Sequence, residues 1–465
     1  MEKFNPSKVA NFIPFTKGAI VFGGHFGDEG KGKIVDILAR KFKNEGYKIL
    51  SIRGQGSGNA GHTVIVDGIK YDFHYLTSAG LSADRMILGP GMLIDPIKVL
   101  EEAEKLPKEK RKIIMISSRA TICCDLDRAM DSYLESLRAN SGIPVIGTTK
   151  SGVGPCEAFR RYRIHLTFAD ALKFNNSKEL MEALINRPLV PEEIKPVITE
   201  EYAEKLYNAI NALNIVDSDI VIEQCRKEQN WAVILEVSQA MGLDPLKGNS
   251  GHFVTSTPTT PLGAIDGSGL TQFDFPDGMY MVIKAYASKV GGGPFITKLK
   301  EGESDIAKFI YNLVGECGVT TGRRRDLGWI DVNAIRAAVN ATGCRHICMN
   351  CMDVIGLIPG GKAKLCYAYK HKETGEITYN NPYHLAEYEP LYEEIETNWD
   401  IVGVKSVNDL PLNALKYIKR IEEMINGNVS YTEYPPCRIS YIGNGGSSDA
   451  IIKIPEGYLD CIETL

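Results

Sequence analysis

A glycine-rich stretch near the N-terminus constrains this chain more than any other feature. Residues 23–34, with the sequence GGHFGDEGKGKI, follow directly on the apolar run 19–22. This order predicts a strand, a loop and then a helix. Glycine permits positive φ and a close approach of backbone N–H groups to a ligand, and the N-terminus of a following helix attracts anions. The stretch therefore predicts a phosphate-binding loop.

The match to a P-loop is incomplete. The spacing Gly27-x4-Gly32-Lys33 fits, but Ile34 stands where a Ser or Thr hydroxyl would bind Mg²⁺. The loop instead carries Asp28, a carboxylate that can bind Mg²⁺ or take a proton. A structural strand-to-helix turn has no evident need of an acid in a phosphate cradle, so the pattern favours nucleotide chemistry.

The composition is that of an ordinary globular protein. The chain has 465 residues, of which 44% are apolar and 24% are charged, and its formal net charge is −5. We expect no binding to nucleic acid or to an anionic membrane. No apolar run of transmembrane length and no N-terminal signal segment is present, so we expect a cytoplasmic protein. Eleven cysteines without framework spacing indicate reduced thiols.

Apolar runs of strand length alternate with segments of helical periodicity along the chain. This alternation predicts an α/β fold with a large, mostly parallel, twisted central sheet flanked by helices, a P-loop-like nucleotide site and helical insertions. We expect an N-terminal extension over residues 1–17 and a single α/β domain over 18–465, with a helical insertion at about 170–230. The predicted strands cover residues 19–22, 47–52, 86–93, 112–116, 231–236, 280–286 and 346–355, and the predicted helices cover 34–43, 96–107, 125–139, a segment from about 305, and 412–425.

Further glycine- and hydroxyl-rich loops follow the predicted strands, at residues 54–63, 147–155, 237–270 and 318–325. Ligands of α/β proteins bind beyond the carboxyl ends of parallel strands, so we expect these loops to converge. The loop 318–325 ends in three consecutive arginines, which suit an anionic ligand because guanidinium groups bind carboxylates and phosphates bidentately. The alternative for this loop is a solvated basic turn.

In their order along the chain these loops resemble the adenylosuccinate synthetase family, which joins aspartate to inosine monophosphate (IMP) at the expense of GTP. The resemblance covers roughly residues 18–455. It rests on the segments Gly27–Lys33, Asn59–Thr63, Gly147–Thr149, Val254–Ser256, Lys284–Tyr286 and Thr320–Trp329.

The resemblance assigns three catalytic roles. Asp28 would be the general base that removes the N1 proton of the purine, which makes its 6-oxygen nucleophilic toward the γ-phosphate. His62 would be the general acid on the β/γ-phosphate side, and Lys31 would stabilise the transferred phosphoryl group. The amino group of aspartate would then displace the phosphate from carbon 6.

The resemblance also implies the ligand sets. Mg²⁺ would be held by Asp28 and the carbonyl of Gly61. GTP would be bound by Gly27, Asp28, Glu29, Gly30, Lys31, Gly32, Lys33, Gly61, His62, Thr63, Arg325, Asp353 and Gly443. IMP would be bound by Asp28, Asn59, Thr149, Arg163, Gln239, Thr255 and Arg323, and L-aspartate by Val319, Thr320, Thr321, Gly322, Arg323 and Arg325. Arg163 would come from the partner subunit, which implies a homodimer.

The sequence departs from the family near the ligands. His25-Phe26 stands where the family has Gln-Trp, and Glu236–Gln239 is EVSQ where the family has EGAQ or EGAN. Cys351 replaces a Lys beside the guanine-reading Asp353, which leaves ATP open as the donor. An alternative is a paralogue that ligates aspartate to GMP or dGMP, although such relatives tend to lack the Asp that this chain retains as Asp28.

Two rivals lie outside this reaction. One is a non-catalytic nucleotide-binding regulatory protein, which would have no use for an aspartate-binding arm. The other is an iron–sulfur site at Cys344-x3-Cys348-x2-Cys351. The surrounding apolar run instead favours a buried strand, in which free cysteine packs as a small hydrophobe.

Overall fold

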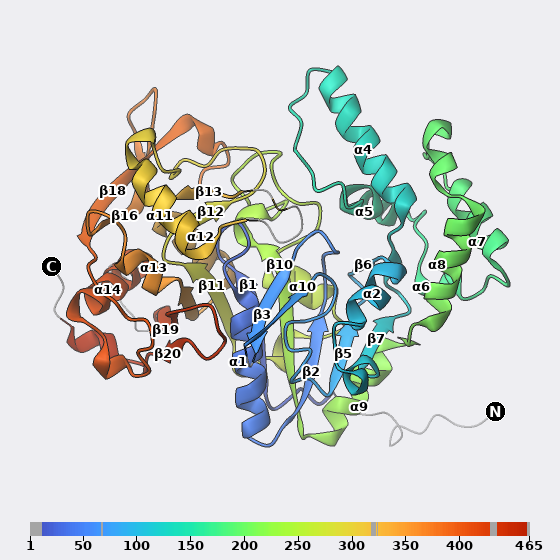
Figure 1. Cartoon of the computed structure of the whole chain (residues 1–465), viewed down its shortest axis with the longest axis horizontal. Coiled ribbons are helices and arrows are strands. Elements are labelled where there is room, and N and C mark those ends of the chain that lie inside the picture. The colour runs from blue at the N-terminus through green and yellow to red at the C-terminus, as the bar shows by residue number, and fades with distance from the viewer. Residues whose placement is uncertain (1–11, 67, 318–321, 323, 428–434, 463–465) are drawn as a thin grey trace.

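A ten-stranded sheet forms the centre of the computed structural model, which describes residues 12–66, 68–317, 322, 324–427 and 435–462. Its strand order is β20-β19-β15-β11-β1-β10-β2-β5-β7-β9, and every pairing is parallel except that of the edge strand β20 with β19 (Figure 1). This confirms the predicted α/β fold. The strands are β1 (Gly18–Gly23), β2 (Lys48–Arg53), β5 (Arg85–Leu88), β7 (Ile114–Ser117), β9 (Ile215–Val216), β10 (Trp231–Ala240), β11 (Met279–Lys284), β15 (His346–Asn350), β19 (Arg438–Gly443) and β20 (Ile451–Lys453).

The middle of the sheet is buried on both faces. β1 is buried along its whole length, and its neighbour β10 is buried at nine of its ten positions. Continuous apolar runs of this kind are typical of parallel strands covered on both sides. Because β2, β10, β1, β11 and β15 run parallel, the loops that follow them leave the sheet at the same edge.

Helices and small sheets extend the molecule at both ends of the central sheet. One end carries the helices between β7 and β10, and α4 projects from the body above them (Figure 1). The helices of this half and of the centre are α1 (Lys31–Asn44), α2 (Pro96–Ala103), α3 (Lys108–Arg111), α4 (Asp125–Asn140), α5 (Val153–Tyr162), α6 (Phe168–Ala171), α7 (Ser177–Ile185), α8 (Glu200–Ala212), α9 (Ser218–Glu228) and α10 (Pro261–Asp266).

The opposite end is built from the C-terminal half of the chain. Its helices are α11 (Ser304–Val314), α12 (Val332–Thr342), α13 (Met352–Gly356) and α14 (Leu412–Asn426). Its small sheets contain β12 (Ala287–Lys289), β13 (Asp326–Gly328), β14 (Ile330–Asp331), β16 (Lys362–His371), β17 (Ile377–Thr378) and β18 (Tyr388–Glu396). Two further two-stranded sheets belong to the N-terminal half, namely β3 (His62–Val66) with β4 (Ile69–Phe73), and β6 (Leu93–Ile94) with β8 (Thr121–Ile122).

Several predicted boundaries differ from the structure. The strand expected over 86–93 ends at Leu88, the strand expected over 280–286 ends at Lys284, and the helix expected over 96–107 ends at Ala103. Two further differences concern β15 and β10. The strand expected over 346–355 ends at Asn350, because Cys351 has φ 62° and α13 begins immediately after it. The strand expected over 231–236 continues as β10 to Ala240. Both differences lie where side chains enter the site. None of the helices in the described part of the chain is long and apolar enough to cross a membrane.

Candidate nucleotide site

The first glycine-rich loop closes around the carboxylate of Glu29. This carboxylate accepts the N–H groups of His25 at 3.2 Å and Gly27 at 2.8 Å, and the Lys31 ammonium lies 3.0 Å away. Burial alone would raise the pKa of Glu29, but the Lys31 charge and these hydrogen bonds lower it. Glu29 is therefore ionised, and it fixes both the loop and the first side chain of α1.

Asn350, at the end of β15, holds the other side of this loop. Its side-chain amide donates to the carbonyl of Glu29 at 2.7 Å and of Gly30 at 3.3 Å. The end of β19 approaches the same amide so closely that a Cβ on Gly443 would lie 2.3 Å from Asn350 Oδ1. Only glycine fits there. Gly443, which the sequence placed at the nucleotide, thus lies beside the phosphate loop.

The Lys33 side chain binds the C-terminal loop. Its ammonium donates to the carbonyls of Gly445 at 2.9 Å and Ala450 at 2.5 Å. Burial lowers the pKa of Lys33 to about 8, against the opposing effects of Cys351 and Asp353. Asp353 is half-buried, and burial raises its pKa while Lys33 opposes the change. The ammonium of Lys33 is therefore engaged by protein carbonyls.

His62, at the start of β3, is held by a carboxylate from the sheet. Its Nδ1 lies 2.6 Å from Glu236 Oε1, and Ser78 donates to the same carboxylate through its N–H and its hydroxyl, both at 2.7 Å. Burial would raise the pKa of Glu236, but His62 and Arg53 lower it to about 2. Because an ionised carboxylate only accepts, Nδ1 of His62 carries the proton.

The other ring nitrogen of His62, Nε2, is not used by the protein in the part of the chain that the structure describes. Burial and the nearby cations Arg53 and Lys31 lower the pKa of His62 against the pull of Glu236. The imidazole is therefore neutral. Nε2 is buried and has no hydrogen-bond partner among the residues that the structure describes. A buried polar nitrogen of this kind requires a partner when a ligand fills the site.

The first two loops contact each other. A Cβ on Gly32 would lie 2.8 Å from the Thr63 carbonyl, so β3 passes directly over the first turn of α1. The hydroxyl of Thr63 donates to Asp72 at 2.6 Å within the β3–β4 hairpin. The second loop, with Asn59 and Gly61 half-buried in it, thus lies against the phosphate loop. This is the expected convergence.

Asp28 forms an ion pair with Arg325, the last residue of the loop 318–325. Arg325 Nε lies 2.9 Å from Asp28 Oδ2, and Arg325 Nη1 donates to Glu316 at 2.5 Å. The side chain of Asp28 is 29% exposed, so it remains accessible from the loop side. The fold therefore joins the predicted base to the predicted aspartate-binding arm.

The residues predicted to bind the acceptor nucleotide are held more loosely. Thr149 is exposed and its hydroxyl donates only to Ser151, at 2.9 Å, within the same loop. Arg163 is exposed at the end of α5. Thr255 is half-buried, and its N–H donates to the carbonyl of Leu243 at 2.8 Å.

Three non-glycine residues at neighbouring strand ends have left-handed backbones. The φ angles of Asp28, Gln239 and Cys351 are 59°, 62° and 62°. Such conformations cost about 1–3 kcal/mol each and concentrate at functional sites. Asp28 lies in the loop after β1, Gln239 is the penultimate residue of β10, and Cys351 directly follows β15, so all three lie toward the carboxyl ends of central strands.

Several predicted residues lie outside the described part of the chain: Val319, Thr320, Thr321 and Arg323. Their assignment to aspartate and IMP stays a prediction. Gly322 between them has φ 63°. Three residues that hold the site were not singled out as site residues from the sequence, namely Glu236, Glu316 and the amide of Asn350. Glu236 had a signal, because it is the one charged residue in the apolar run 231–237.

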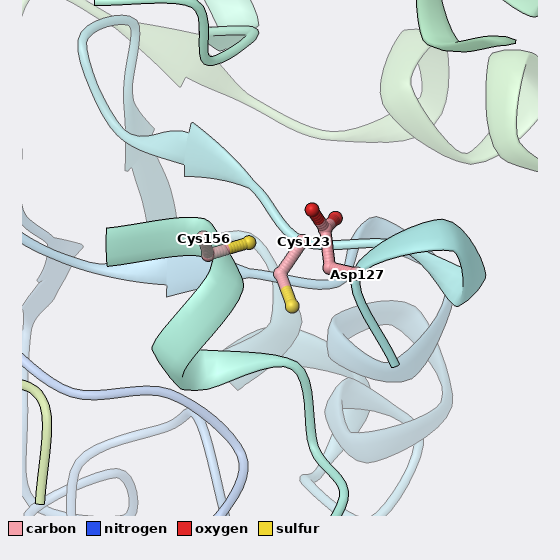
Figure 2. Close-up of side chains that lie close together, drawn as sticks. All are labelled: Cys123, Asp127 and Cys156. Atoms are coloured by element: carbon pink, nitrogen blue, oxygen red, sulfur yellow. The ribbon is translucent and has the colours of Figure 1, made fainter. Parts of the chain in front are cut away.

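A second cluster of potential ligands lies against the loop 147–155, where the Cys123 thiol donates to the carbonyl of Ser151 at 3.4 Å. Cys123, Asp127 and Cys156 bring their sulfur and oxygen atoms within 4.8 Å of one another (Figure 2). Asp127 is already bonded to Arg187 at 3.0 Å and to the N–H of Cys124 at 2.8 Å. Burial raises the pKa of Cys156 well above its usual range. A protonated Cys156 thiol beside a carboxylate that is already paired with Arg187 is typical of a packed core rather than a metal site.

The cysteines of the other proposed cluster, Cys344, Cys348 and Cys351, flank or lie in the buried strand β15. Burial raises the pKa of all three thiols. Their sulfur atoms do not converge to within 4.8 Å of one another. They pack as small hydrophobic side chains.

Comparison with known proteins agrees with this geometry. The sequence model of the family "Adenylosuccinate synthetase" matches residues 20–442. The adenylosuccinate synthetase of Acetivibrio thermocellus is 35% identical over 425 residues, which are 87% of this chain and 94% of that protein. The one from Fusobacterium nucleatum is 33% identical over 441 residues, covering 90% and 97%.

Two solved structures are similar over most of their length. The fully ligated adenylosuccinate synthetase of Plasmodium falciparum has a TM-score of 0.80 and 29% identity, covering 94% of this chain and 99% of its own. The cyanophage S-2L succinoaminodeoxyadenylate synthetase, bound to dGMP and to dATP as an energy donor, has a TM-score of 0.59 and 16% identity, covering 97% and 100%. At that identity the second likeness concerns the fold.

Proposed function

Because this chain belongs to the adenylosuccinate synthetase family of C–N ligases, we propose that it joins L-aspartate to IMP at the expense of GTP. The products would be adenylosuccinate, GDP and phosphate. One observation carries the proposal. A carboxylate with a strained backbone, Asp28, lies in the phosphate loop and is tied to the arm by Arg325.

The first step is a phosphoryl transfer. Asp28 accepts the N1 proton of the purine, and the electron pair released moves to the 6-oxygen, which attacks the γ-phosphorus. The bond from the γ-phosphorus to the bridging oxygen breaks, and GDP leaves. The N–H groups of the loop 27–33 and the Lys31 ammonium, fixed by Glu29, stabilise the charge on the phosphoryl oxygens. The product is a 6-phosphoryl purine.

His62 acts on the leaving-group side of this phosphoryl transfer. With Nδ1 bonded to Glu236, its Nε2 is the atom that meets the phosphates. Negative charge from the nucleotide favours the protonated imidazole, which then donates from Nε2 to a β- or γ-phosphate oxygen. Glu236 stabilises the resulting positive charge. This pair thus provides an acid that forms only when nucleotide is bound.

The donor set suits Mg²⁺. Asp28 offers a half-buried carboxylate, and Gly61 offers a backbone carbonyl in the adjacent loop. Hard oxygen ligands of this kind bind Mg²⁺ together with phosphate oxygens. When bound, the ion would neutralise charge on the β- and γ-phosphates.

The second step forms the C–N bond. The amino group of aspartate attacks carbon 6, the bond from carbon 6 to the phosphorylated oxygen breaks, and phosphate leaves with that oxygen. Residues 319–323 and Arg325 would bind the aspartate carboxylates. Arg325 is placed for this role at the end of the loop, since its guanidinium already binds carboxylates there.

The acceptor phosphate would be bound by a dimeric site. Arg163 is exposed after α5, and Thr149 is exposed in the preceding loop. Exposed polar groups of this kind fit a phosphate site completed by a second subunit. We therefore include a homodimer with Arg163 donated across the interface.

The donor base is the least constrained part of the proposal. Asp353 is half-buried next to Lys33, where a carboxylate can accept from the guanine N1–H and 2-amino groups. The Cys351 position, which holds a Lys in the family, favours ATP as a second candidate donor, and His25-Phe26 and the segment 236–239 favour another 6-oxopurine nucleotide as a second candidate acceptor.

A pairwise assay tests these choices. Each of IMP, GMP and dGMP is combined with GTP or ATP, L-aspartate and Mg²⁺, and absorbance near 280 nm follows product formation. We expect IMP with GTP to have the highest kcat/KM. Higher kcat/KM with dGMP or with ATP would replace the acceptor or the donor, and no turnover in any pair would favour the regulatory protein instead.

A further inference from the structure

Glu316 is a buried carboxylate beside the proposed general base that has no role in the chemistry above. Its side chain is 3% exposed. It follows α11 and stands at the neck of the loop 317–324, where the N–H of Arg325 donates to the Glu316 carbonyl at 3.0 Å and Cys317 forms an antiparallel bridge with Arg324. Glu316 and Arg325 therefore join the two ends of the predicted aspartate-binding loop.

Three donors hold the Glu316 carboxylate. Oε1 accepts the Lys284 ammonium at 2.7 Å and the hydroxyl of Tyr286, and Oε2 accepts Arg325 Nη1 at 2.5 Å. Burial raises the pKa of Tyr286 well above its usual range, so its hydroxyl stays a donor. Burial would also raise the pKa of Glu316, but Lys284 and Arg325 lower it to about 2. Glu316 is ionised at neutral pH.

Glu316 and Asp28 share one guanidinium. Arg325 bonds to Asp28 through Nε, at 2.9 Å, and to Glu316 through Nη1. A guanidinium facing one carboxylate normally binds it through two parallel N–H groups. Glu316 instead holds the guanidinium through Nη1, on the side away from the Nε–H, and Asp28 accepts a single bond, from Nε to Oδ2.

We propose, on the basis of the ligase function proposed above, that Glu316 is a positioning residue for that reaction. It holds Arg325 so that the guanidinium makes one bond to Asp28, and the other carboxylate oxygen of Asp28 remains for the N1 proton of the purine. Lys284, at the end of β11, and Tyr286 hold Glu316 in place. Without the Glu316 charge, Arg325 would turn to Asp28 with both N–H groups and occupy the base.

The test is Glu316→Gln, which keeps the shape and removes the charge. We expect kcat to fall about 10- to 100-fold, as for the loss of a charged hydrogen bond, while KM for the donor nucleotide stays within about threefold. Glu316→Asp retains the charge and should recover most of the lost kcat. A purely structural role would lower the amount of folded enzyme without this split between kcat and KM.

Glu303→Gln is the matched control. Glu303 also accepts a lysine, Lys364 at 2.7 Å, and an aromatic side chain, Trp329 at 2.9 Å, from the start of the same helix. Neither of its partners is a predicted site residue. We expect kcat and KM of this variant within about twofold of wild type. Thermal melting of both variants reports any loss of folding.

The outcomes separate the two proposals. A wild-type protein that turns over no 6-oxopurine nucleotide overturns the ligase function and the positioning role with it. An active wild type with kcat of Glu316→Gln within twofold, or with a loss no larger than that of Glu303→Gln, overturns the positioning role alone. If Glu316→Gln does not fold, Tyr286→Phe removes one donor and keeps both charges. It should lower kcat about two- to fivefold at constant KM, and an unchanged kcat contradicts the proposal.

Discussion

The donor side and the acceptor side of the site are held by different means. On the donor side, Glu29, His62 and Asn350 are ionised or polar groups buried within the fold, and each is bonded to fixed partners. Two of these bonds join residues more than 150 positions apart in the chain. On the acceptor side, Thr149 and Arg163 are exposed, and the Thr149 hydroxyl bonds only within its own loop.

This difference separates contacts that the folded protein makes by itself from contacts that form only when ligands bind. Buried ion pairs fix the phosphate loop before a nucleotide arrives, so the donor site needs little reorganisation. On the acceptor side, Asp131 holds the loop 147–155 through the Thr148 hydroxyl and the Gly152 N–H, both at 3.1 Å, but the predicted ligands Thr149 and Arg163 themselves stay exposed. In the proposed function, the nucleotide and a second subunit would complete their contacts. Substitutions should therefore change kcat on the donor side and mainly KM on the acceptor side.

The largest effect is expected for Asp28→Asn. The amide cannot accept the N1 proton, so kcat should fall at least about 10³-fold. Affinity for the donor nucleotide, measured by calorimetry, should survive because the loop N–H groups and Lys31 are unchanged. Activity equal to that of wild type would remove Asp28 from its role.

Glu236→Gln tests the buried support of His62. The neutral amide no longer fixes the Nδ1 proton or stabilises a protonated ring, so kcat should fall about 10- to 100-fold. Glu102→Gln is a matched control, because Glu102 is a buried carboxylate bonded to the N–H of Tyr75 at 2.9 Å. Equal losses of kcat in both variants would contradict a specific role for Glu236.

Arg163→Ala tests the exposed side. We expect KM for IMP to rise about tenfold or more with a smaller change in kcat, since a charged bond to the substrate phosphate is lost. Mixing this variant with Asp28→Asn should restore about one quarter of wild-type activity, because half of the dimers then hold one intact site. No recovery on mixing would place Arg163 in its own subunit's site or outside any site.

The smallest expected effect is the uptake of protons when the nucleotide binds. Burial lowers the pKa of His62 below its usual range, so the free protein holds it neutral at pH 7. Bound phosphate raises that pKa, and nucleotide binding should take up a fraction of one proton, increasing from pH 8 toward pH 6.5. Calorimetry in buffers of different ionisation enthalpy measures this uptake. Its persistence in His62→Gln would assign the proton to another group.

Local patterns were sufficient for the framework of the fold. The order of strand, glycine-rich loop and helix at 19–43, and the helices 125–139 and 412–425, followed from apolar periodicity and match β1, α1, α4 and α14. The break after Asn350 could not be predicted, because the left-handed backbone of Cys351 is imposed by packing rather than by residue preference.

Sequence patterns also could not predict which residues pair with each other in the site. His62 meets Glu236 across 174 positions, and Arg325 meets Asp28 across 297. Motifs identified His62 but not Glu236, and they identified Asp28 and Arg325 without showing that the two residues pair. Only the sheet order, with β1 between β10 and β11, brings the members of each pair together. Distant carboxylates such as Glu316 have no local signal that separates them from surface acids.

The central claim is that the purine 6-oxygen leaves on phosphate, and isotope transfer tests it most directly. IMP labelled with ¹⁸O at position 6 is incubated with the protein, GTP, Mg²⁺ and L-aspartate, and the released phosphate is analysed by mass spectrometry. The mechanism predicts one ¹⁸O atom in each phosphate formed with product. Product formation with unlabelled phosphate would contradict it.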